Sequence, residues 1–531
     1  MEISSKQVQI AFLVCTLLFS GCTKLGPDFL KPEAPVADEW LEPEDIPDDI
    51  TITADASDYA EWWKSFNDPV LDSFISMAYE QNLTLQIAGI RILESRAQLG
   101  IAVGNVYPQQ QTAGAGVSRN WASKNAIPPG SPTAFNAANI GLGVGWELDL
   151  WGQFARGIEA ADADVLASIT DYDDVLVSLT GGVANAYTLI RTAEEQLVIA
   201  RNNVKIQKRS LEITTVRFEN GITTELDVQQ AKTLLLNTQA TIPAIEIGLQ
   251  QSKNALSTLL GLPPSNLDEY LQGPGVIPTA PAEVAIGIPA ELLRRRPDIR
   301  TAELLAASQS ARIGIAQADL YPHFSLVGSV GLSAADNFGV NLGDIAESDS
   351  IQANFGPSVS WDIFNYGRIR NNVRVQDARL QQNLVNYQNV VLQAAREVED
   401  ALVGFIQAKK RVYFLTDSVK AAQRGVDLAL IQYRDGVADY QRVLDTQESL
   451  LQQEDQLTSS KGDIATNLIA MYIALGGGWE IRQGNDFVHA ETKETMKERT
   501  NWGELLDTTT PEAVSDEIKS EEGKTFRKID W

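Results

Sequence analysis

The sequence lacks several features on which common protein functions depend. Its 531 residues include two cysteines, Cys15 and Cys22, and two histidines, His323 and His489, at unrelated positions, so neither a disulfide framework nor a metal cluster is visible. The net charge of −27 argues against nucleic acid, whose phosphates need a basic surface. After the N-terminus, no apolar run reaches the roughly 18 residues of a membrane-spanning helix. No phosphate-binding loop follows a strand.

The N-terminus has the composition of a signal peptide. Lys6 precedes an apolar segment, and Ser20-Gly21-Cys22 provides a small-residue cleavage site. We expect residues 1–21 to be removed and Cys22 to carry a covalent lipid, because a cysteine at the cleavage point resembles a bacterial lipobox. The alternative is an ordinary signal peptide with an incidental cysteine. No other cofactor is expected. Residues 22–60 are rich in proline and acidic residues, which predicts an extended strap.

The rest of the chain contains an internal repeat with a period of about 215 residues. AQLGIAVGNVYP (97–108) returns as ARIGIAQADLYP (311–322), VGWELDLWGQ (144–153) as VSWDIFNYGR (359–368), and RFENGITTELDV (217–228) as QYRDGVADYQRV (432–443). Three matches in the same order at nearly one offset indicate a duplication. We predict repeat 1 over 61–280, repeat 2 over 281–479 and a polar C-terminal extension over 480–531.

Each repeat contains a strand in which apolar residues alternate strictly with small or polar ones. In repeat 1 the apolar face is formed by Ile140, Leu142, Val144, Trp146, Leu148 and Leu150. Residues 351–363 repeat the pattern, and a partner strand precedes each copy, which predicts β-hairpins over 107–150 and 321–364. About twelve residues at ~3.3 Å each, tilted ~40°, cross a membrane of roughly 30 Å. The polar-face acids assigned to a lumen are Glu147, Asp149 and Asp362.

Four such strands cannot close a barrel by themselves. Open sheet edges are not tolerated in lipid, so the barrel must be shared between copies of the chain, two copies giving eight strands and three giving twelve. The alternative is a soluble sandwich strand, but the glycines would be costly there and Pro357 would fit only an edge.

Long proline-free stretches follow both predicted β-hairpins. Apolar residues recur in them at alternating steps of four and three, as along a coiled-coil seam. In repeat 1 these residues are Val165, Ile169, Tyr172, Leu176, Leu179, Val183, Ala186, Ile190, Ala193 and Leu197. We predict long helical hairpins over 154–260 and 367–476, with tips ~95 Å from the strands. A further helix is expected before each β-hairpin, over 67–102 and 294–316.

At this point the chain resembles the TolC-type outer membrane factors, specifically the lipoprotein branch that serves tripartite RND-type efflux pumps. The matching segments are CTKLGPDFLKP (22–32), WWKSFNDPVLDSFISMA (62–78), ARIGIAQADLYP, RRRPDI (294–299) and GVADYQRVLDTQESLL (436–451). The resemblance runs from Cys22 to about Trp479. It implies an α+β membrane protein, a homotrimer in which twelve strands form an outer-membrane β-barrel and twelve helices form a periplasmic α-barrel.

The resemblance also implies a function and partners. The protein would be the outer-membrane exit duct of an efflux pump, anchored in outer-membrane lipid and extending into the periplasm. Its helix tips would bind a periplasmic adaptor, which is joined to an inner-membrane pump. The tip residues expected to contact the adaptor are Asn220, Gly221, Asp435, Gly436 and Val437.

In this family the pore is closed at the helix tips. The gate residues expected here are Asp445, Arg442, Tyr433 and Asp227. Asp445 and Tyr433 match the family pattern, whereas Gln441 replaces an apolar gate residue and Glu448 replaces an arginine. Arg442 and Asp227 occupy matching positions of the two repeats, so we expect them to cross-link neighbouring hairpins. The alternative is two solvated charges worth under ~1 kcal/mol.

Three other functions are compatible with parts of the sequence. Glu147 and Asp149 could act as an acid–base pair in an enzyme, but both fall on the polar face of one strand, and a lumen lining explains them without catalysis. We therefore expect no enzymatic activity. The same tube could serve type I protein secretion. A non-conducting periplasmic coiled coil is the third alternative, against which the membrane-type hairpins argue.

Overall fold

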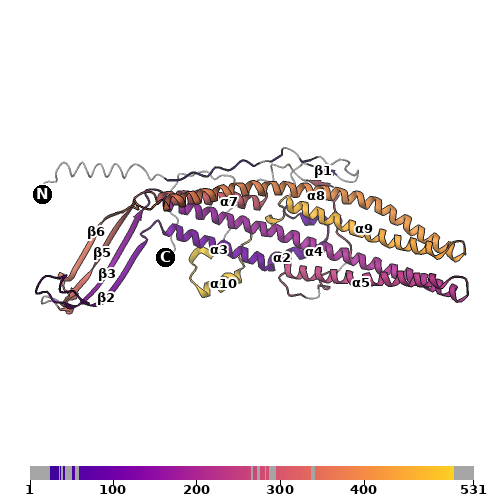
Figure 1. Ribbon diagram of the computed structural model, residues 1–531, viewed down its shortest axis with the longest axis horizontal. Coiled ribbons are helices and arrows are strands. Elements are labelled where there is room, and N and C mark those ends of the chain that lie inside the picture. Colours follow the sequence, from indigo (N-terminus) through magenta and orange to yellow (C-terminus); the bar gives the residue numbers. More distant parts are fainter. Residues whose placement is uncertain are drawn as a thin grey trace.

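The protein is long and narrow, with a β-sheet at one end and two helical tips at the other (Figure 1). The computed structural model describes residues 24–506 except 35, 38–39, 42–50, 54–58, 265–266, 272–274, 282, 286–294 and 337–340. The predicted signal peptide, Cys22 and residues 507–531 lie outside the described residues. None of the helices in the described ranges is both long and apolar enough to cross a membrane.

The sheet contains four antiparallel strands, two from each repeat. They are β2 (Gln110–Trp121), β3 (Ala134–Leu148), β5 (His323–Ala335) and β6 (Ile351–Ser360). Their order is β2-β3-β5-β6, so the two repeats join through the β3–β5 ladder, in which Leu148 pairs with Phe324. The alternating apolar side chains of β3 are exposed in the single chain, as the sequence pattern predicts for a lipid-facing strand.

Glycine permits unusually close contact at the centre of this sheet. Gly114 pairs with Gly141, and Gly141 pairs with Gly331 across β2, β3 and β5. A Cβ atom on Gly331 would lie 2.5 Å from the carbonyl oxygen of Ile140, closer than real Cβ contacts. Backbone packing therefore requires glycine at Gly331 and restricts Gly141, whereas a Cβ on Gly114 would meet no atom within 4 Å.

Two long helices leave the sheet, one from each repeat. They are α4 (Gln153–Glu219) and α8 (Arg368–Arg434), each of 67 residues and therefore about 100 Å long. Gly152 (φ 74°) and Gly367 (φ 84°) precede them in the left-handed region, where glycine has no steric penalty, so each strand can turn directly into its helix. The chain returns through α5 (Glu225–Leu259) and α9 (Tyr440–Ala474).

The predicted helical seams form most of the hydrophobic core. Every seam residue of repeat 1 except Ala193 is buried. In repeat 2 the seam is buried between Tyr387 and Ala408. The core also receives the aromatic residues Trp62 and Trp63 from a 3-10 helix over Trp62–Phe66. Fully burying each large apolar side chain contributes about 1.5–3 kcal/mol, so this seam fixes how α4 and α8 pack against the helices beside them.

The prediction of a single helix over 67–102 was wrong. The structure has two helices, α2 (Pro69–Gln81) and α3 (Leu83–Gly104), separated at Asn82. The Asn82 side chain accepts the backbone N–H of Leu85 at 2.8 Å and donates to the carbonyl oxygen of Leu259 at 2.8 Å. An asparagine that caps the second helix favours this break. Asp68 caps α2 by accepting the backbone N–H of Val70 at 3.0 Å. In repeat 2, α7 (Pro297–Ala318) is one helix, which begins at Pro297 within the predicted range of 294–316 and ends two residues beyond it.

The described part of the N-terminal strap is held by a buried arginine. Arg156, in the first turns of α4, donates to the carbonyl oxygens of Leu25 (2.9 Å) and Gly26 (3.2 Å) and pairs with Asp28 (2.8 Å) and Glu159. Its side chain is 2% exposed. Later in the strap, a short strand β1 (Thr51–Thr53) pairs in parallel with β4 (Glu283–Ala285), which the sequence did not predict.

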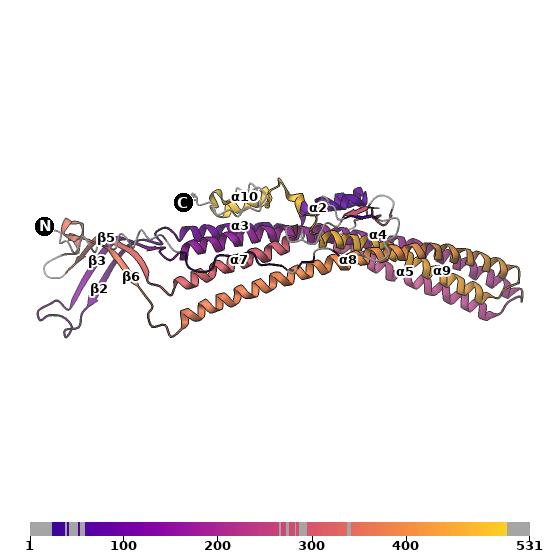
Figure 2. The ribbon, with the colours of Figure 1, turned by 90° about the horizontal axis from the view of Figure 1, so that it is seen from above.

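The described part of the C-terminal extension is folded. It contains 3-10 helices over Trp479–Arg482 and Gly503–Leu506 and an α-helix, α10 (Ala490–Arg499), and it lies beside α3 in both views (Figures 1 and 2). Phe487, Val488 and Met496 are buried in the main core. Arg482 forms an ion pair with Asp173 of α4. Burial raises the pKa of the Asp173 carboxyl to about 6, against the opposing effect of Arg482.

Candidate functional site at the helix tips

The two helical hairpins end in turns of the same design at the end opposite the sheet (Figure 1). Gly221 (φ 70°) and Gly436 (φ 78°) take the left-handed conformation just after the first helix of each hairpin. The next N–H then bonds back into that helix, from Ile222 to the oxygen of Arg217 and from Val437 to the oxygen of Gln432, at 2.8 and 2.9 Å. This is a helix-ending motif that requires glycine. The repeat therefore builds one tip geometry twice.

The residues predicted to contact an adaptor lie on the surface of these turns. Asn220, Gly221, Asp435 and Gly436 are exposed, and Val437 is 79% exposed. Next to them, two further apolar side chains of the first tip, Phe218 (41%) and Ile222 (62%), also face solvent. Exposed apolar side chains beside a flat turn are typical of a surface that binds another protein.

Behind the second tip lies a small buried cluster, which we call the tyrosine cluster. It consists of Ala231, Ala429, Tyr433, Tyr440 and Val443. The rings of Tyr433 and Tyr440 meet edge to face with centroids 5.3 Å apart. Burial raises the pKa of the Tyr440 hydroxyl, which lies 3.4 Å from Ser210 Oγ. Tyr433, expected at a gate, is thus a buried residue that joins α8 to α9.

Sequence reasoning missed Arg217, the side chain that connects the two tips of one chain. Arg217 lies in the last turn of α4 and donates to two carbonyl oxygens at the end of α8, those of Tyr433 (2.8 Å) and Arg434 (3.0 Å). Its guanidinium carbon also lies 4.6 Å from the centroid of the Tyr433 ring. The only sequence signal was a cation in the last turn of a long helix, which is too common to be specific.

The predicted gate acid Asp445 belongs to a chain of hydrogen bonds across the tips. Gln441 donates to Asp445 Oδ1 at 2.6 Å and accepts from Gln230 of α5 at 3.1 Å. Gln441, the departure from the family pattern, therefore links α5 to α9 with its polar amide. The exposed Glu448 forms no ion pair among the described residues. The structure brings Asp445, Gln441 and Gln230 together without bringing Arg442 to them.

Arg442 and Asp227 do not pair with each other within one chain. Arg442 is exposed, and its backbone N–H is capped by Asp439. Asp227 lies in the first turn of α5, and its carboxylate accepts a hydrogen bond from Thr223, which precedes the helix. Across the part of the chain that the structure describes, neither side chain forms an ion pair, so any cross-link between them would have to join different chains.

At the other end of the molecule, the strand assignment of two predicted lumen acids was wrong. β3 ends at Leu148, and Asp149 accepts the backbone N–H of Ala155 at 2.8 Å at the start of α4. β6 ends at Ser360, and Asp362 pairs with Arg368 at 3.2 Å. Alternation alone did not reveal that the strands end early, because acids that contact the start of the next helix continue the pattern. Glu147 remains on β3, where it contacts His323 of β5 at 2.5 Å.

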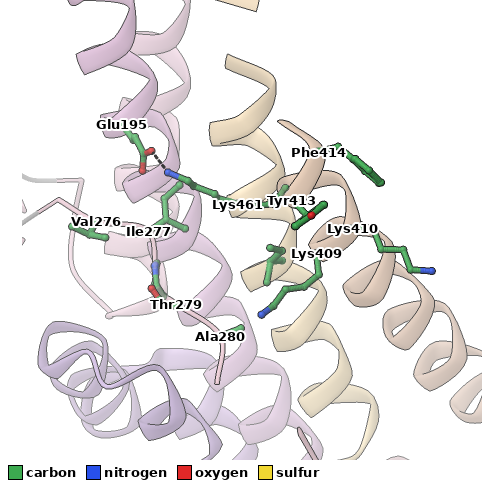
Figure 3. Close-up of a pocket in the computed structure, with 13 residues that line it drawn as sticks. Glu195, Val276, Ile277, Thr279, Ala280, Lys409, Lys410, Tyr413, Phe414 and Lys461 are labelled. Carbon is green, nitrogen blue, oxygen red and sulfur yellow. Dashed lines mark hydrogen bonds and ion pairs between the residues drawn. The ribbon is translucent and has the colours of Figure 1, made fainter. Parts of the chain in front are cut away.

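A cavity of about 1060 Å³ lies between α4, α8, α9 and residues 276–280 (Figure 3). Apolar side chains and the lysines Lys409, Lys410 and Lys461 line it, and Lys461 reaches Glu195 at 2.9 Å. Glu195 lies about seven helical turns before the tip. None of the predicted site residues lines this cavity. Among the described residues, no group of three or more His, Cys, Asp or Glu side chains is placed to hold a metal ion.

Comparison with known proteins gives one consistent result. The sequence profile of the outer membrane efflux protein family matches residues 74–262 and 288–477, one match in each repeat. Nodulation protein T of Rhizobium leguminosarum bv. trifolii is 29% identical over 464 residues, covering 87% of this chain and 96% of that protein. The probable efflux pump outer membrane protein TtgC of Pseudomonas putida is 28% identical over 488 residues, covering 91% and 98%.

The fold comparison agrees with the sequence comparison. The solved structure of the outer-membrane channel OprN superposes with a TM-score of 0.77 and 30% sequence identity, covering 86% of this chain and all of that one. The likeness therefore extends over most of the chain.

Proposed function

The chain belongs to the outer membrane efflux protein family, and on that premise we propose how its parts act. It is an outer-membrane component of an efflux pump and provides the exit duct. The observation that carries this function is the duplicated hairpin and long helix, which separates a membrane-type sheet from paired tips by about 100 Å. Conduction through the duct is passive, so the chain needs neither an enzymatic step nor a cofactor beyond its lipid.

We propose that three copies form the working duct. Within the described chain, β2 and β6 are the outer strands of the sheet, and an open edge is not tolerated in lipid. Three copies would close a twelve-stranded barrel, and α4, α5, α8 and α9 would contribute twelve helices. The end of α8 nearest the sheet stands apart from α4 (Figure 2). Leu392 and Val403 of α8 and Ile247 of α5 are more than half exposed, which supports burial against neighbouring copies.

The tips are the proposed docking surface for a periplasmic adaptor, through which the duct is joined to an inner-membrane pump. The proposed contacts are Asn220, Gly221, Asp435, Gly436 and Val437. Their exposure and the apolar side chains of Ile222 and Val437 support this role. Adaptor binding at the tips would couple the pump to the opening of the duct.

The tips are also the proposed gate. Asp445, Arg442, Tyr433 and Asp227 are the residues assigned to it. Tyr433 would hold the second hairpin through the tyrosine cluster, and Asp445 would line the narrowest ring. Arg442 and Asp227, which form no ion pair within the described chain, are available to pair with each other between chains. Glu147 is proposed to face the duct near the sheet, and Asp149 and Asp362 its junction with the helices.

The N-terminal strap is proposed to end in a lipid anchor. Cys22 would carry the lipid, and Arg156 holds the strap at residues 25–28, just beyond the anchor. Gly152, at the junction of sheet and helix, packs against Lys24, since a Cβ there would lie 2.8 Å from the Lys24 Cα atom. The anchor would therefore lie close to the sheet, where outer-membrane lipid is expected.

Single-channel conductance of the purified protein in a planar bilayer tests the gated duct. We expect small closed-state currents in the wild type and larger ones in Asp445→Ala and Arg442→Glu. Arg209→Gln, which removes an exposed cation of α4 paired only with Glu212, is the matched control and should behave as wild type. A freely open wild-type pore would refute the gate and keep the duct. No conductance from a verified trimer in any variant would refute the duct.

A further inference from the structure

The contact between Arg217 and the end of α8 joins the two helical hairpins of one chain at their tips. Arg217 belongs to the first hairpin and both of its carbonyl acceptors belong to the second. The last carbonyls of a helix have no intrahelical donor and carry partial negative charge. A guanidinium can donate to two of them at once and stack on the aromatic ring beside them, so this is a strong type of interhelical contact.

The seam between the hairpins needs such a contact because it becomes polar near the tips. The buried residues of α4 along this stretch are Asn203, Val204, Gln207, Ser210 and Thr214, and the four polar ones follow the seam spacing. Arg217 is the next position of the same stripe. Opposite them on α9, Gln447 is 1% exposed, and like Gln207 its amide atoms have no hydrogen-bond partner among the described residues. Buried unpaired amides weaken the seam they occupy.

The internal repeat offers this contact at one of the two kinds of junction that a ring of hairpins would contain. The repeat aligns Arg217 and Phe218 of the first hairpin with Gln432 and Tyr433 of the second. In a ring of hairpins that alternate in this way, the equivalent contact would run from Gln432 of one copy to Phe218 of the next. Glutamine carries no charge and offers no cation for an aromatic ring. Phe218 is 41% exposed, whereas Tyr433 is buried at 3%.

We propose that Arg217 is a positioning residue for the gate, which clasps the two hairpins of one chain, and that the junction between chains at Gln432 lacks this clasp. The inference rests on the gated trimeric duct proposed above. Arg217 acts through the backbone of Tyr433 and Arg434, setting where the second hairpin places Asp445. The closed ring then alternates between junctions that Arg217 holds, within each chain, and junctions between chains, which depend on the proposed pair of Arg442 and Asp227.

The proposal is tested by moving the clasp, the contact of Arg217 with the carbonyl oxygens of Tyr433 and Arg434, to the junction at Gln432. Arg217→Gln makes both junctions alike, and loss of two charge-assisted hydrogen bonds per chain at a half-exposed site is expected to raise the open probability about tenfold. Arg217→Lys keeps the charge and the donor but lacks the planar group that lies over the Tyr433 ring, and should give a smaller rise. Adding Gln432→Arg to Arg217→Gln installs the clasp at the other junction and should return the open probability toward wild type. Arg209→Gln serves again as the control.

The conductance results distinguish a failure of the Arg217 clasp from a failure of the gated duct. A purely structural role for Arg217 would lower the thermal stability of the trimer and leave the conductance of folded trimers unchanged, and Gln432→Arg would not reverse it. If Arg217→Gln conducts as wild type while Asp445→Ala opens the pore, the clasp is refuted and the gate stands. If no variant conducts, the duct is refuted and the clasp with it.

Discussion

Replacing Arg156 with methionine should release the N-terminal strap. The side chain is 2% exposed and donates to two consecutive strap carbonyls, those of Leu25 and Gly26. Hydrogen bonds to a charged group contribute about 1.5–3 kcal/mol each, so losing both should weaken strap docking by about 3 kcal/mol or more. The contact with Asp28 adds little, because that carboxylate is 87% exposed.

Limited trypsin digestion measures this release directly. The Lys24–Leu25 bond is held on its C-terminal side by the bond from Leu25 N to Trp151 O (3.1 Å) and by Arg156 at Leu25 O. Cleavage follows the population of the opened strap, so about 3 kcal/mol corresponds to about a hundredfold faster cut, scored by mass spectrometry. It would also separate Cys22 from the folded chain.

Asp28→Asn is the matched control for Arg156→Met. Asp28→Asn removes only an exposed carboxylate, worth at most about 1 kcal/mol, and should speed the cut less than about fivefold. If Arg156→Met retains wild-type helix content by circular dichroism and is cut at the wild-type rate, Arg156 does not hold the strap.

Three further changes are expected to have measurable effects. Asn82→Ala should lower the free energy of unfolding by about 1–3 kcal/mol, whereas Asn82→Asp, which keeps the cap and loses the donor, should cost less in thermal melts. Asp173, whose pKa rises to about 6 when folded, binds more protons folded than unfolded, so its contribution to stability falls as pH rises from about 4 to 6. Over this range the free energy of unfolding should therefore fall more steeply with pH, or rise less steeply, in the wild type than in Asp173→Asn, and equal slopes would contradict the burial argument. Gln441→Leu should raise single-channel conductance less than Asp445→Ala, because the carboxylate stays; an equal rise would assign the gate to the amide instead.

Much of the architecture was predictable because the same pattern of strands and helices occurs in both repeats of the sequence. Strand alternation and seam spacing are periodic signals that depend on many residues, and their recurrence at one offset excludes coincidence. The glycines at the tips were equally readable, since a turn between two long helices needs a residue tolerant of positive φ. The hairpins therefore lie where the sequence placed them, including both 67-residue helices.

What the sequence did not reveal depends on single side chains meeting across the fold. Asn82 breaks a helix because its amide finds a carbonyl of α5, and Asp149 leaves the strand because it caps a helix. Arg217 gains its acceptors only when the two tips come together. The C-terminal residues to Leu506 read as polar overall, yet a few apolar ones dock into the core. Such contacts have no period and leave no pattern in one sequence.

The β3–β5 ladder has a consequence for how the chain folds. Its two strands are separated in sequence by both helices of the first hairpin and by α7, whereas each helical hairpin closes through a turn of a few residues. Closing the long loop costs more conformational entropy than closing a short turn, so local hairpins form early and distant strand pairing forms late. By the same argument the local β-hairpins β2–β3 and β5–β6 form early, so the open edges of β3 and β5 stay unpaired until the folded helices bring the two β-hairpins together.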